Sequence, residues 1–210
     1  MSILLLFYYS FTPFLLLSMK KLMTLLLMCL IGITANAQSA EKLYNDGKEL
    51  YDAKRYEAAF PKLKAAAEKG HKKAQYRLGR CYDKGNGVEE SNTLAFEWYL
   101  KSADQGYAKA QYQVGKSYKN GEGVDKDIFK AVEYFTKAAK QDNGDAQLDL
   151  GKCYLKGKGV EKDEAKAKEW LKRAVKNEKD GKTIVKELRQ EASEDDEDAK
   201  LILQMLGIKL

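Results

Sequence analysis

The sequence contains few of the residues on which most catalytic and metal sites depend. Its 210 residues include one histidine, His71, so a serine or cysteine nucleophile has only this one possible histidine base. His71 lies in a lysine-rich connection and is expected to be an exposed loop residue. Its three cysteines form no Cys-x-x-Cys pair, which excludes a common ligand spacing of zinc sites. A Walker-type phosphate loop is also absent from the sequence. We therefore expect no catalytic residue, no metal and no cofactor.

Proline and linker sequence are scarce as well. The chain has two prolines and no long Gly/Ser-rich stretch, which argues for one domain rather than two domains joined by a hinge. Charged residues make up 32% of the chain and leave a net charge of +6, with both signs mixed along it. Such mixing argues against a nucleic-acid partner.

The N-terminal residues 1–37 differ in composition from the rest. From Met19 the chain has a basic pair, then an apolar stretch, and then Ala35-Asn36-Ala37, which has the A-x-A form of a cleavage site. This order predicts a secretory signal peptide that starts at Met19 and is cleaved after Ala37. We therefore expect an exported protein, periplasmic or extracellular, with no stable transmembrane anchor after processing.

Two alternatives remain for this region. The apolar run at residues 2–18 is near the lower length limit for spanning a bilayer, so a retained membrane anchor is one of them. The other is a lipoprotein attached through Cys29, although Met28 stands where such signals have a small residue. In the preferred interpretation, residues 1–18 precede the true start.

An internal repeat dominates the remaining sequence. The pattern Ala-Gln-(Tyr/Leu)-x-(Leu/Val)-Gly begins at Ala74, Ala110 and Ala146, at a constant spacing of 36 residues. Each copy continues into Gly-x-Gly-Val, then a serine or aspartate, and then an apolar stretch with helical spacing. Glycine after a helix and Ser or Asp before one are typical caps. The repeat therefore predicts stacked units of helix, tight turn and helix, which is an all-α fold.

Two residue types in the repeat carry predictions about packing. Glycine costs a helix about 1 kcal/mol relative to alanine, so its recurrence at Gly79, Gly115 and Gly151 predicts a close approach of two helices. Aromatic residues that recur at fixed positions are expected to be core spacers. These aromatic residues are Tyr82, Tyr118, Tyr154, Trp98, Tyr134 and Trp170.

Cys81 and Cys153 occupy the same position in the first and third copies. Two stacking steps of roughly 10 Å would separate them, whereas a disulfide needs Cα atoms within about 7 Å. We therefore expect two buried, unpaired cysteines.

The segments that flank the full copies complete the array. Residues 42–73 form a degenerate leading repeat in which Gly47 matches Gly79, with a shorter turn. The solenoid is thus expected to span residues 38–177, with one degenerate and three full repeats. Repeat arrays need a terminal cap over their last apolar face, so residues 178–210, with an acidic loop at Glu194–Asp198, are expected to form it.

The combined pattern of motif, turn and capped helix resembles the Sel-one-like repeat family, a branch of the tetratricopeptide superfamily. The resemblance covers about residues 42–177. It implies a right-handed α-solenoid that holds other proteins. Some exported bacterial members have a cysteine pair in every repeat, and this sequence lacks the second cysteine of each pair.

One face of the first helices is a candidate binding surface. Residues at i, i+3, i+4 and i+7 share a helix face, and in tetratricopeptide-like solenoids this face lines the concave groove. One of its positions is basic in every repeat, beside two tyrosines, which suits a partner protein or peptide that carries carboxylates. The candidate partner-binding residues are Lys48, Arg80, Lys116, Lys152, Tyr76, Tyr112 and Arg77.

Several alternatives to this binding scaffold stay open. The basic face could be an ordinary solvated surface, or the acidic tail could occupy the groove in the same chain. The protein could also bind anionic polysaccharide or lipid headgroups, which predicts an affinity that falls steeply with salt. An exported enzyme acting on cell-wall or beta-lactam-like substrates is the remaining alternative, although the sequence supplies no candidate nucleophile.

Overall fold

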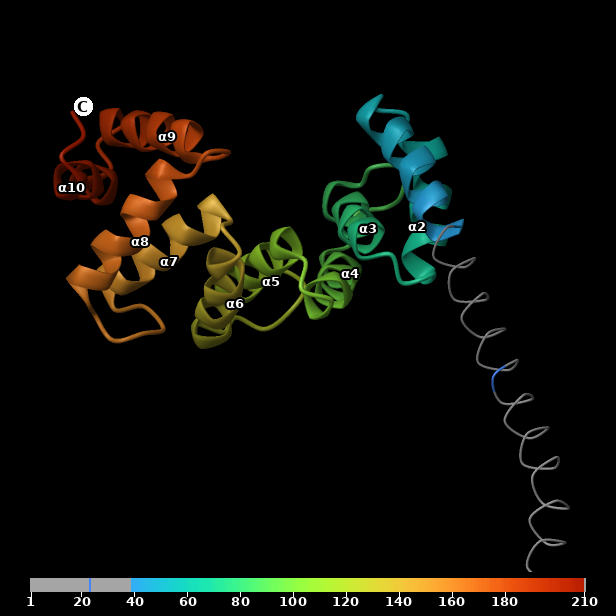
Figure 1. Cartoon of the computed structure of the whole chain (residues 1–210), viewed down its shortest axis with the longest axis horizontal. Coiled ribbons are helices and arrows are strands. Elements are labelled where there is room, and N and C mark those ends of the chain that lie inside the picture. Colours follow the sequence, from blue (N-terminus) through green and yellow to red (C-terminus); the bar gives the residue numbers. More distant parts are fainter. Residues whose placement is uncertain (1–22, 24–38, 210) are drawn as a thin grey trace, which may run out of the picture.

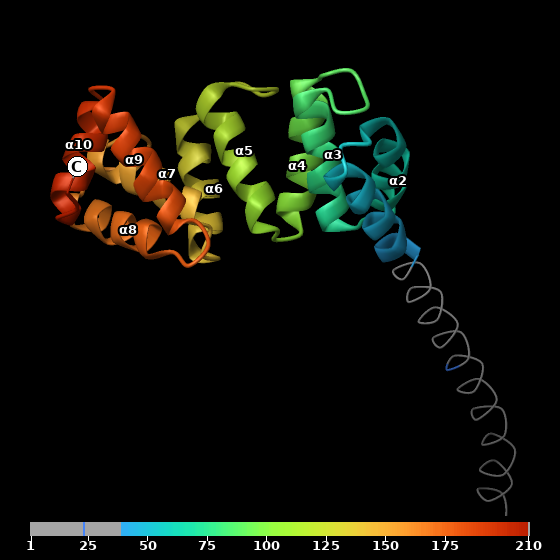
Figure 2. The same cartoon turned by 90° about the horizontal axis from the view of Figure 1, so that it is seen from above.

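The computed structural model describes residue 23 and residues 39–209, and every regular element in this part of the chain is a helix. This architecture confirms the predicted all-α solenoid. The helices follow one another in chain order along the long axis (Figure 2) and together form an arc (Figure 1). The predicted signal region at residues 1–37 lies almost entirely outside the described residues.

The helical hairpins follow the 36-residue register of the sequence. A helical segment at residues 39–52 comes first, and it packs against α2 through Gly47 and Leu63. The remaining helices are α2 (Tyr56–Glu68), α3 (Lys72–Lys84), α4 (Asn92–Asp104), α5 (Ala108–Asn120), α6 (Ile128–Lys140), α7 (Gly144–Lys156), α8 (Glu164–Lys176), α9 (Gly181–Ser193) and α10 (Glu197–Leu206).

The helices begin and end at the residues that the caps predict. Gly121 ends α5 with a φ of 82°, a left-handed conformation that glycine adopts without steric cost, and its amide bonds the Ser117 carbonyl. Asp127 begins α6, where its carboxylate accepts hydrogen bonds at 3.0 Å from the amides of Phe129 and Lys130. Equivalent caps occur in the other two copies, so the turn sequence fixes both helix boundaries.

The motif glycine marks a close approach within each hairpin, as predicted. A Cβ atom added to Gly115 would lie 2.6 Å from two ring carbons of Phe135 and 3.2 Å from the Ala131 carbonyl oxygen. Gly79 faces Tyr99 in the first copy at nearly the same distances. The absent side chain therefore makes room for the large residue of the second helix.

The fully buried aromatic residues of the second helices lie one position later in the sequence than predicted. Tyr99 and Phe135 are 2% and 0% exposed, whereas Trp98 and Tyr134 are only half-buried. One residue corresponds to about 100° of rotation around a helix, which turns Trp98 from the centre of the core to its edge. There the Lys101 ammonium lies 4.0 Å from the centre of its ring. Trp98 and Tyr134 therefore lie at the edge of the core, and the prediction that they occupy its centre as spacers is wrong.

The glutamine of the Ala-Gln motif ties consecutive hairpins together. The Gln111 amide nitrogen donates to the carbonyl oxygen of Ala103 at the end of the preceding helix, at 3.3 Å. Its own oxygen accepts from Gln141 at 2.7 Å. Gln111 is 6% exposed, and buried polar groups of this kind are stabilising only when they are hydrogen-bonded. The same arrangement joins Gln75 to Ala67.

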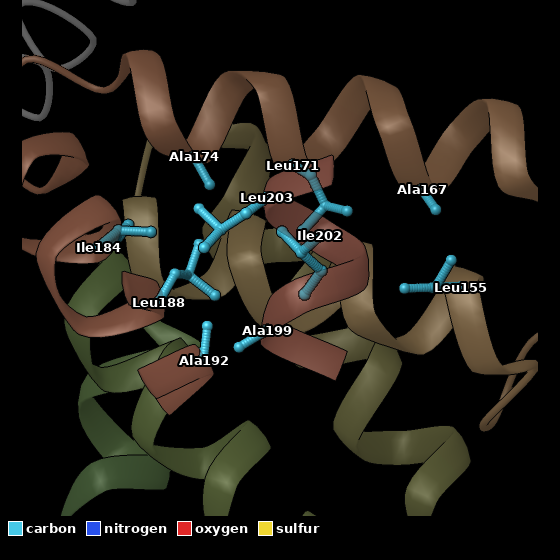
Figure 3. Close-up of a cluster of buried hydrophobic side chains, with 10 residues drawn as sticks. All are labelled: Leu155, Ala167, Leu171, Ala174, Ile184, Leu188, Ala192, Ala199, Ile202 and Leu203. Atoms are coloured by element: carbon cyan, nitrogen blue, oxygen red, sulfur yellow. The ribbon is translucent and has the colours of Figure 1, made fainter. Parts of the chain in front are cut away.

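The last three helices share one hydrophobic cluster. Side chains from α8, α9 and α10 point toward one another in Figure 3. Leu171 of α8 meets Leu188 of α9 and Ile202 of α10, and each is at most 1% exposed. Residues 178–209 thus cover the apolar side of α8, the position in which a terminal cap is needed.

Cys81 and Cys153 are free and buried, as predicted. Burial raises the pKa of each thiol to about 11, so both are protonated at neutral pH. Cys29 lies outside the described residues. Within residues 39–209 and at residue 23, no helix has the length and apolar composition needed to cross a membrane.

Candidate functional site

The inner side of the arc is formed by the first helix of each hairpin. Figure 1 shows α3, α5 and α7 facing the inside of the curve, with α4, α6 and α8 outside them. The predicted partner-binding residues all lie on these inner helices or on the helical segment 39–52. These residues therefore all belong to the inner layer of helices, whose side toward the inside of the arc is called here the inner face.

The two tyrosines of the inner face are partly sunk into it. The Tyr76 ring packs 5.3 Å from Tyr107 and 5.8 Å from Tyr99, and Tyr112 packs 5.8 Å from Phe135. Burial is the main cause that raises the pKa of both tyrosine hydroxyls. Both groups therefore stay protonated at neutral pH. The Tyr112 hydroxyl already donates to Asp149, whereas the Tyr76 hydroxyl accepts from Gln113 and keeps its hydrogen to donate to a bound group.

Lys48, Arg80, Lys116 and Lys152 occupy the position that is basic in every repeat, and two of them are paired with carboxylates of the same chain. Lys48 pairs with Asp52 at 2.9 Å, and Lys152 pairs with Glu191 of α9 at 3.5 Å. The acidic end of the chain thus reaches the inner face in part. Among residues 39–209, neither Arg80 nor Lys116 has a carboxylate within ion-pair distance.

Arg80 and Lys116 are instead held by aromatic rings. The Arg80 guanidinium lies 5.9 Å from the centre of the Tyr51 ring, and the Lys116 ammonium lies 5.9 Å from the centre of the Tyr112 ring. Arg77 also lies over Tyr51, at 5.3 Å, and pairs with Asp52 at 3.0 Å. Of the four cations at the basic position, Arg80 and Lys116 are therefore the two without an ion pair among residues 39–209, and they occupy equivalent positions in successive repeats.

The face becomes acidic toward the third repeat. Position 149 is aspartate where the first copy has Arg77, and Asp145 lies near it. The pKa of Asp145 is raised, first by desolvation and then by the neighbouring charges of Asp180 and Glu187. A hollow of about 150 Å³ lies between these groups and the tyrosines. Its lining residues are Tyr76, Lys109, Tyr112, Gln113, Asn143, Asp145 and Asp180.

A larger hollow, of about 510 Å³, lies where α5 meets α7. It is called here the lysine hollow, because lysines from both helices and from the following turns surround it. Lys119 reaches across it and pairs with Asp149 at 2.9 Å. The lining residues are Lys119, Asn120, Lys126, Ile128, Asp149, Lys152, Cys153, Lys156 and Lys158.

The histidine expected in an exposed loop is a structural residue. Its Nδ1 atom accepts a hydrogen bond from the Ala74 amide at 3.1 Å, so His71 caps the start of α3. The ring also stacks on Tyr44 at 4.4 Å, and its Nε2 atom lies 2.8 Å from Glu41. These contacts leave 13% of the side chain exposed, which corrects the expectation of an exposed loop residue. Within residues 39–209, no group of three His, Cys, Asp or Glu side chains is placed to hold a metal ion.

Comparison with protein families matches the model of the Sel1 repeat at residues 72–107, 108–143 and 144–178. These three matches cover half of the chain and follow the register of the helical hairpins. The chain belongs to the Sel1 repeat family. Its α-solenoid is the fold expected of this family, and Sel1 repeats generally form scaffolds for protein interactions.

Solved structures of other Sel1 repeat proteins resemble this one. The Sel1 repeat protein of Oxalobacter formigenes is 39% identical, with a TM-score of 0.62, over 64% of this chain and 54% of that protein. The protective antigen c5321 of uropathogenic Escherichia coli is 27% identical, with a TM-score of 0.66, over 85% of this chain and 40% of that protein. This Sel1 chain thus spans only about half the length of these relatives. Among curated proteins no relative matches it.

Proposed function

We propose that this Sel1 repeat protein is a non-catalytic scaffold that binds another protein or a peptide along its inner face, with Arg80 and Lys116 as the main charged contacts. The observation that carries the proposal is that these two cations have no ion pair within residues 39–209, whereas Lys48 and Lys152 have one. A partner carboxylate can therefore pair with Arg80 or Lys116 without displacing an existing ion pair.

The aromatic residues beside these cations support binding of a peptide backbone. Tyr76 and Tyr112 lie one repeat apart. The Tyr76 hydroxyl keeps a hydrogen that can donate to a backbone carbonyl, whereas the Tyr112 hydroxyl already donates to Asp149. Their rings are fixed by packing against Tyr99 and Phe135. Rigid aromatic side chains give contact area at a low cost in conformational entropy. The expected partner is therefore a protein segment with carboxylate side chains.

We further propose that the scaffold acts outside the cytoplasm, in the periplasm or beyond the cell. This part of the proposal rests on the order of basic pair, apolar stretch and Ala35-Asn36-Ala37 after Met19. N-terminal sequencing of the protein purified from its native cells tests it. A mature chain that begins at Gln38 is the expected result, and a chain that retains residues 19–37 would contradict it.

Partner capture from the native cell envelope tests the binding face. The double variant Arg80→Ala/Lys116→Ala should lose the partner that the wild-type protein retains, while its far-UV circular dichroism is unchanged. The matched control is Lys64→Ala/Lys172→Ala, because these exposed lysines lie on the outer helices α2 and α8. Capture that persists in the first variant, or is lost equally in both, would contradict the proposal.

A further inference from the structure

Within residues 39–209, successive helical hairpins meet at four junctions. One position near the end of the first helix of each hairpin lies at such a junction, and its residue differs from repeat to repeat. At the first junction Tyr51 occupies it, where Arg77 and Arg80 lie over its ring and Asn86 donates to its hydroxyl at 2.9 Å. The repeat register places Asp83, Lys119 and Leu155 at the equivalent positions. Leu155 is 6% exposed and belongs to the last hydrophobic cluster. The tyrosine and leucine therefore fill their junctions with apolar side chains.

The junction at Lys119 is the one that forms the lysine hollow. The Lys119 ammonium reaches Asp149 rather than filling the space with a ring, and the hollow keeps about 510 Å³. This volume lies within the range of roughly 300–1,000 Å³ that is typical of ligand pockets. Asp149 is the only carboxylate among the described residues that line it, against five lysines. The lining of the hollow therefore has an excess of lysines over carboxylates.

Carboxylates of the chain itself already bind lysines of this hollow. Glu191 of α9 pairs with Lys152 at 3.5 Å, and Asp198 of α10 pairs with Lys156. Both acids come from the C-terminal helices rather than from the repeat that carries the lysines. The contacts show that side-chain carboxylates from a neighbouring helix fit at the edge of the hollow.

Two lysines of the hollow have no such partner. Within the described part of the chain, neither Lys126 nor Lys158 lies within ion-pair distance of a carboxylate. They come from the turns after α5 and α7, so they flank the hollow from different repeats. Their charges are left for a bound group.

The local backbone favours carboxylates over phosphate. A phosphate site usually uses the free amides at a helix N-terminus or the fork of an arginine. The helix α6 begins beside the hollow, but Asp127 already accepts hydrogen bonds from its first-turn amides. The lining contains no arginine among the described residues, and lysines act as separate point charges that suit several spaced carboxylates.

We propose that the lysine hollow binds an acidic segment of a partner protein, in which several Asp or Glu side chains lie close together in sequence. Lys126 and Lys158 are its main contacts, and Glu191 and Asp198 of the C-terminal helices compete with it for Lys152 and Lys156. The inference rests on the proposed scaffold function and names a class of partner segment and a place for it.

Fluorescence anisotropy with a labelled oligoglutamate peptide tests this site directly. The wild-type protein should bind it, and should not bind an oligoglutamine peptide of the same length. Lys126→Glu/Lys158→Glu should weaken binding about tenfold, which corresponds to about 1.4 kcal/mol, because at both positions an attraction to the peptide is replaced by a repulsion. Lys64→Glu/Lys172→Glu makes the same change in net charge on the outer helices and should alter affinity by less than about twofold.

A third variant tests the competition by the C-terminal helices. Glu191→Gln/Asp198→Asn frees Lys152 and Lys156 and should raise the affinity for oligoglutamate. Circular dichroism of each variant excludes unfolding as the cause. Equal weakening by the hollow and outer variants, binding unaffected by the hollow variant, or binding of inorganic pyrophosphate in place of the peptide would overturn the inference.

The two proposals fail separately. If oligoglutamate does not bind, while partner capture still depends on Arg80 and Lys116, the lysine hollow is wrong and the inner-face scaffold stands. If capture does not depend on Arg80 and Lys116, while oligoglutamate binding depends on Lys126 and Lys158, the charged contacts of the scaffold are misplaced and the hollow stands.

Discussion

Replacing Gly115 with alanine should destabilise the solenoid, although alanine is the better helix former. The helix preference alone favours alanine by about 1 kcal/mol. The added Cβ, however, would lie 2.6 Å from two ring carbons of Phe135, and 3.2 Å from the Ala131 carbonyl oxygen. The ring is 0% exposed and cannot swing into solvent. Overpacking of a tight core costs about 1–3 kcal/mol, and contacts this short favour the upper end.

The net expectation is a loss of about 2 kcal/mol in the free energy of unfolding. For a protein of this size each kcal/mol lowers the melting temperature by roughly 2–4 °C, so the shift should be about 4–8 °C. Urea and thermal unfolding followed by circular dichroism measure it. Lys109→Ala on the same helix is the control, because an exposed substitution should change the stability by less than about 0.5 kcal/mol.

A double-mutant cycle with Phe135→Ala isolates the contact. Phe135→Ala alone should cost about 3–5 kcal/mol, as expected for a fully buried aromatic residue. Adding Gly115→Ala to that variant should be neutral or stabilising by up to about 1 kcal/mol, because the ring is gone. If Gly115→Ala stabilises the wild-type protein by about the helix preference, the close approach of α5 and α6 is refuted.

Two further predictions concern single groups in the first repeats. Tyr99→Phe should leave the free energy of unfolding unchanged or raise it by about 1 kcal/mol. The buried Tyr99 hydroxyl has no hydrogen-bond partner among the described residues, and the next copy has phenylalanine at this position. A loss above about 1 kcal/mol in urea unfolding would show that the hydroxyl is hydrogen-bonded. The pKa of the Glu41 carboxyl is below its ordinary value of 4.5, and the hydrogen bond with His71 is the largest cause. The small stabilisation by this ionised carboxylate is therefore present above pH 4.5 and is lost as the pH falls through the lowered pKa. Melting temperatures measured from neutral to acidic pH should therefore fall less for Glu41→Gln than for the wild type, and parallel curves would contradict this assignment.

The repeat register predicted the fold because one spacing fixes several features together. Turn glycines, N-caps and motif glycines recur in phase, so the sequence alone predicts the helix boundaries near Gly121 and Asp127 and the close approach at Gly115. The facing of Trp98 could not be predicted in this way, because adjacent large residues Trp98 and Tyr99 both suit a core and differ by one step of rotation.

The charge state of the inner face depends on contacts between segments that the register does not relate. Lys152 has the same position in its repeat as Arg80 and Lys116, yet it pairs with Glu191 from α9, which has no counterpart in the repeats. The lysine hollow was missed for a related reason. Its signal was the exchange of Tyr51 for Lys119 at one register position, which gains meaning only when the space around that position is known.

Site-specific photo-cross-linking in the native cells tests the central claim, that the inner face is the binding surface. A photo-reactive residue replaces Gln113 on α5, between the two inner-face tyrosines, or Lys172 on the outer helix α8. We expect a covalent adduct with a partner protein from position 113 and none from position 172. Adducts from position 172 alone, or from both positions equally, would contradict it.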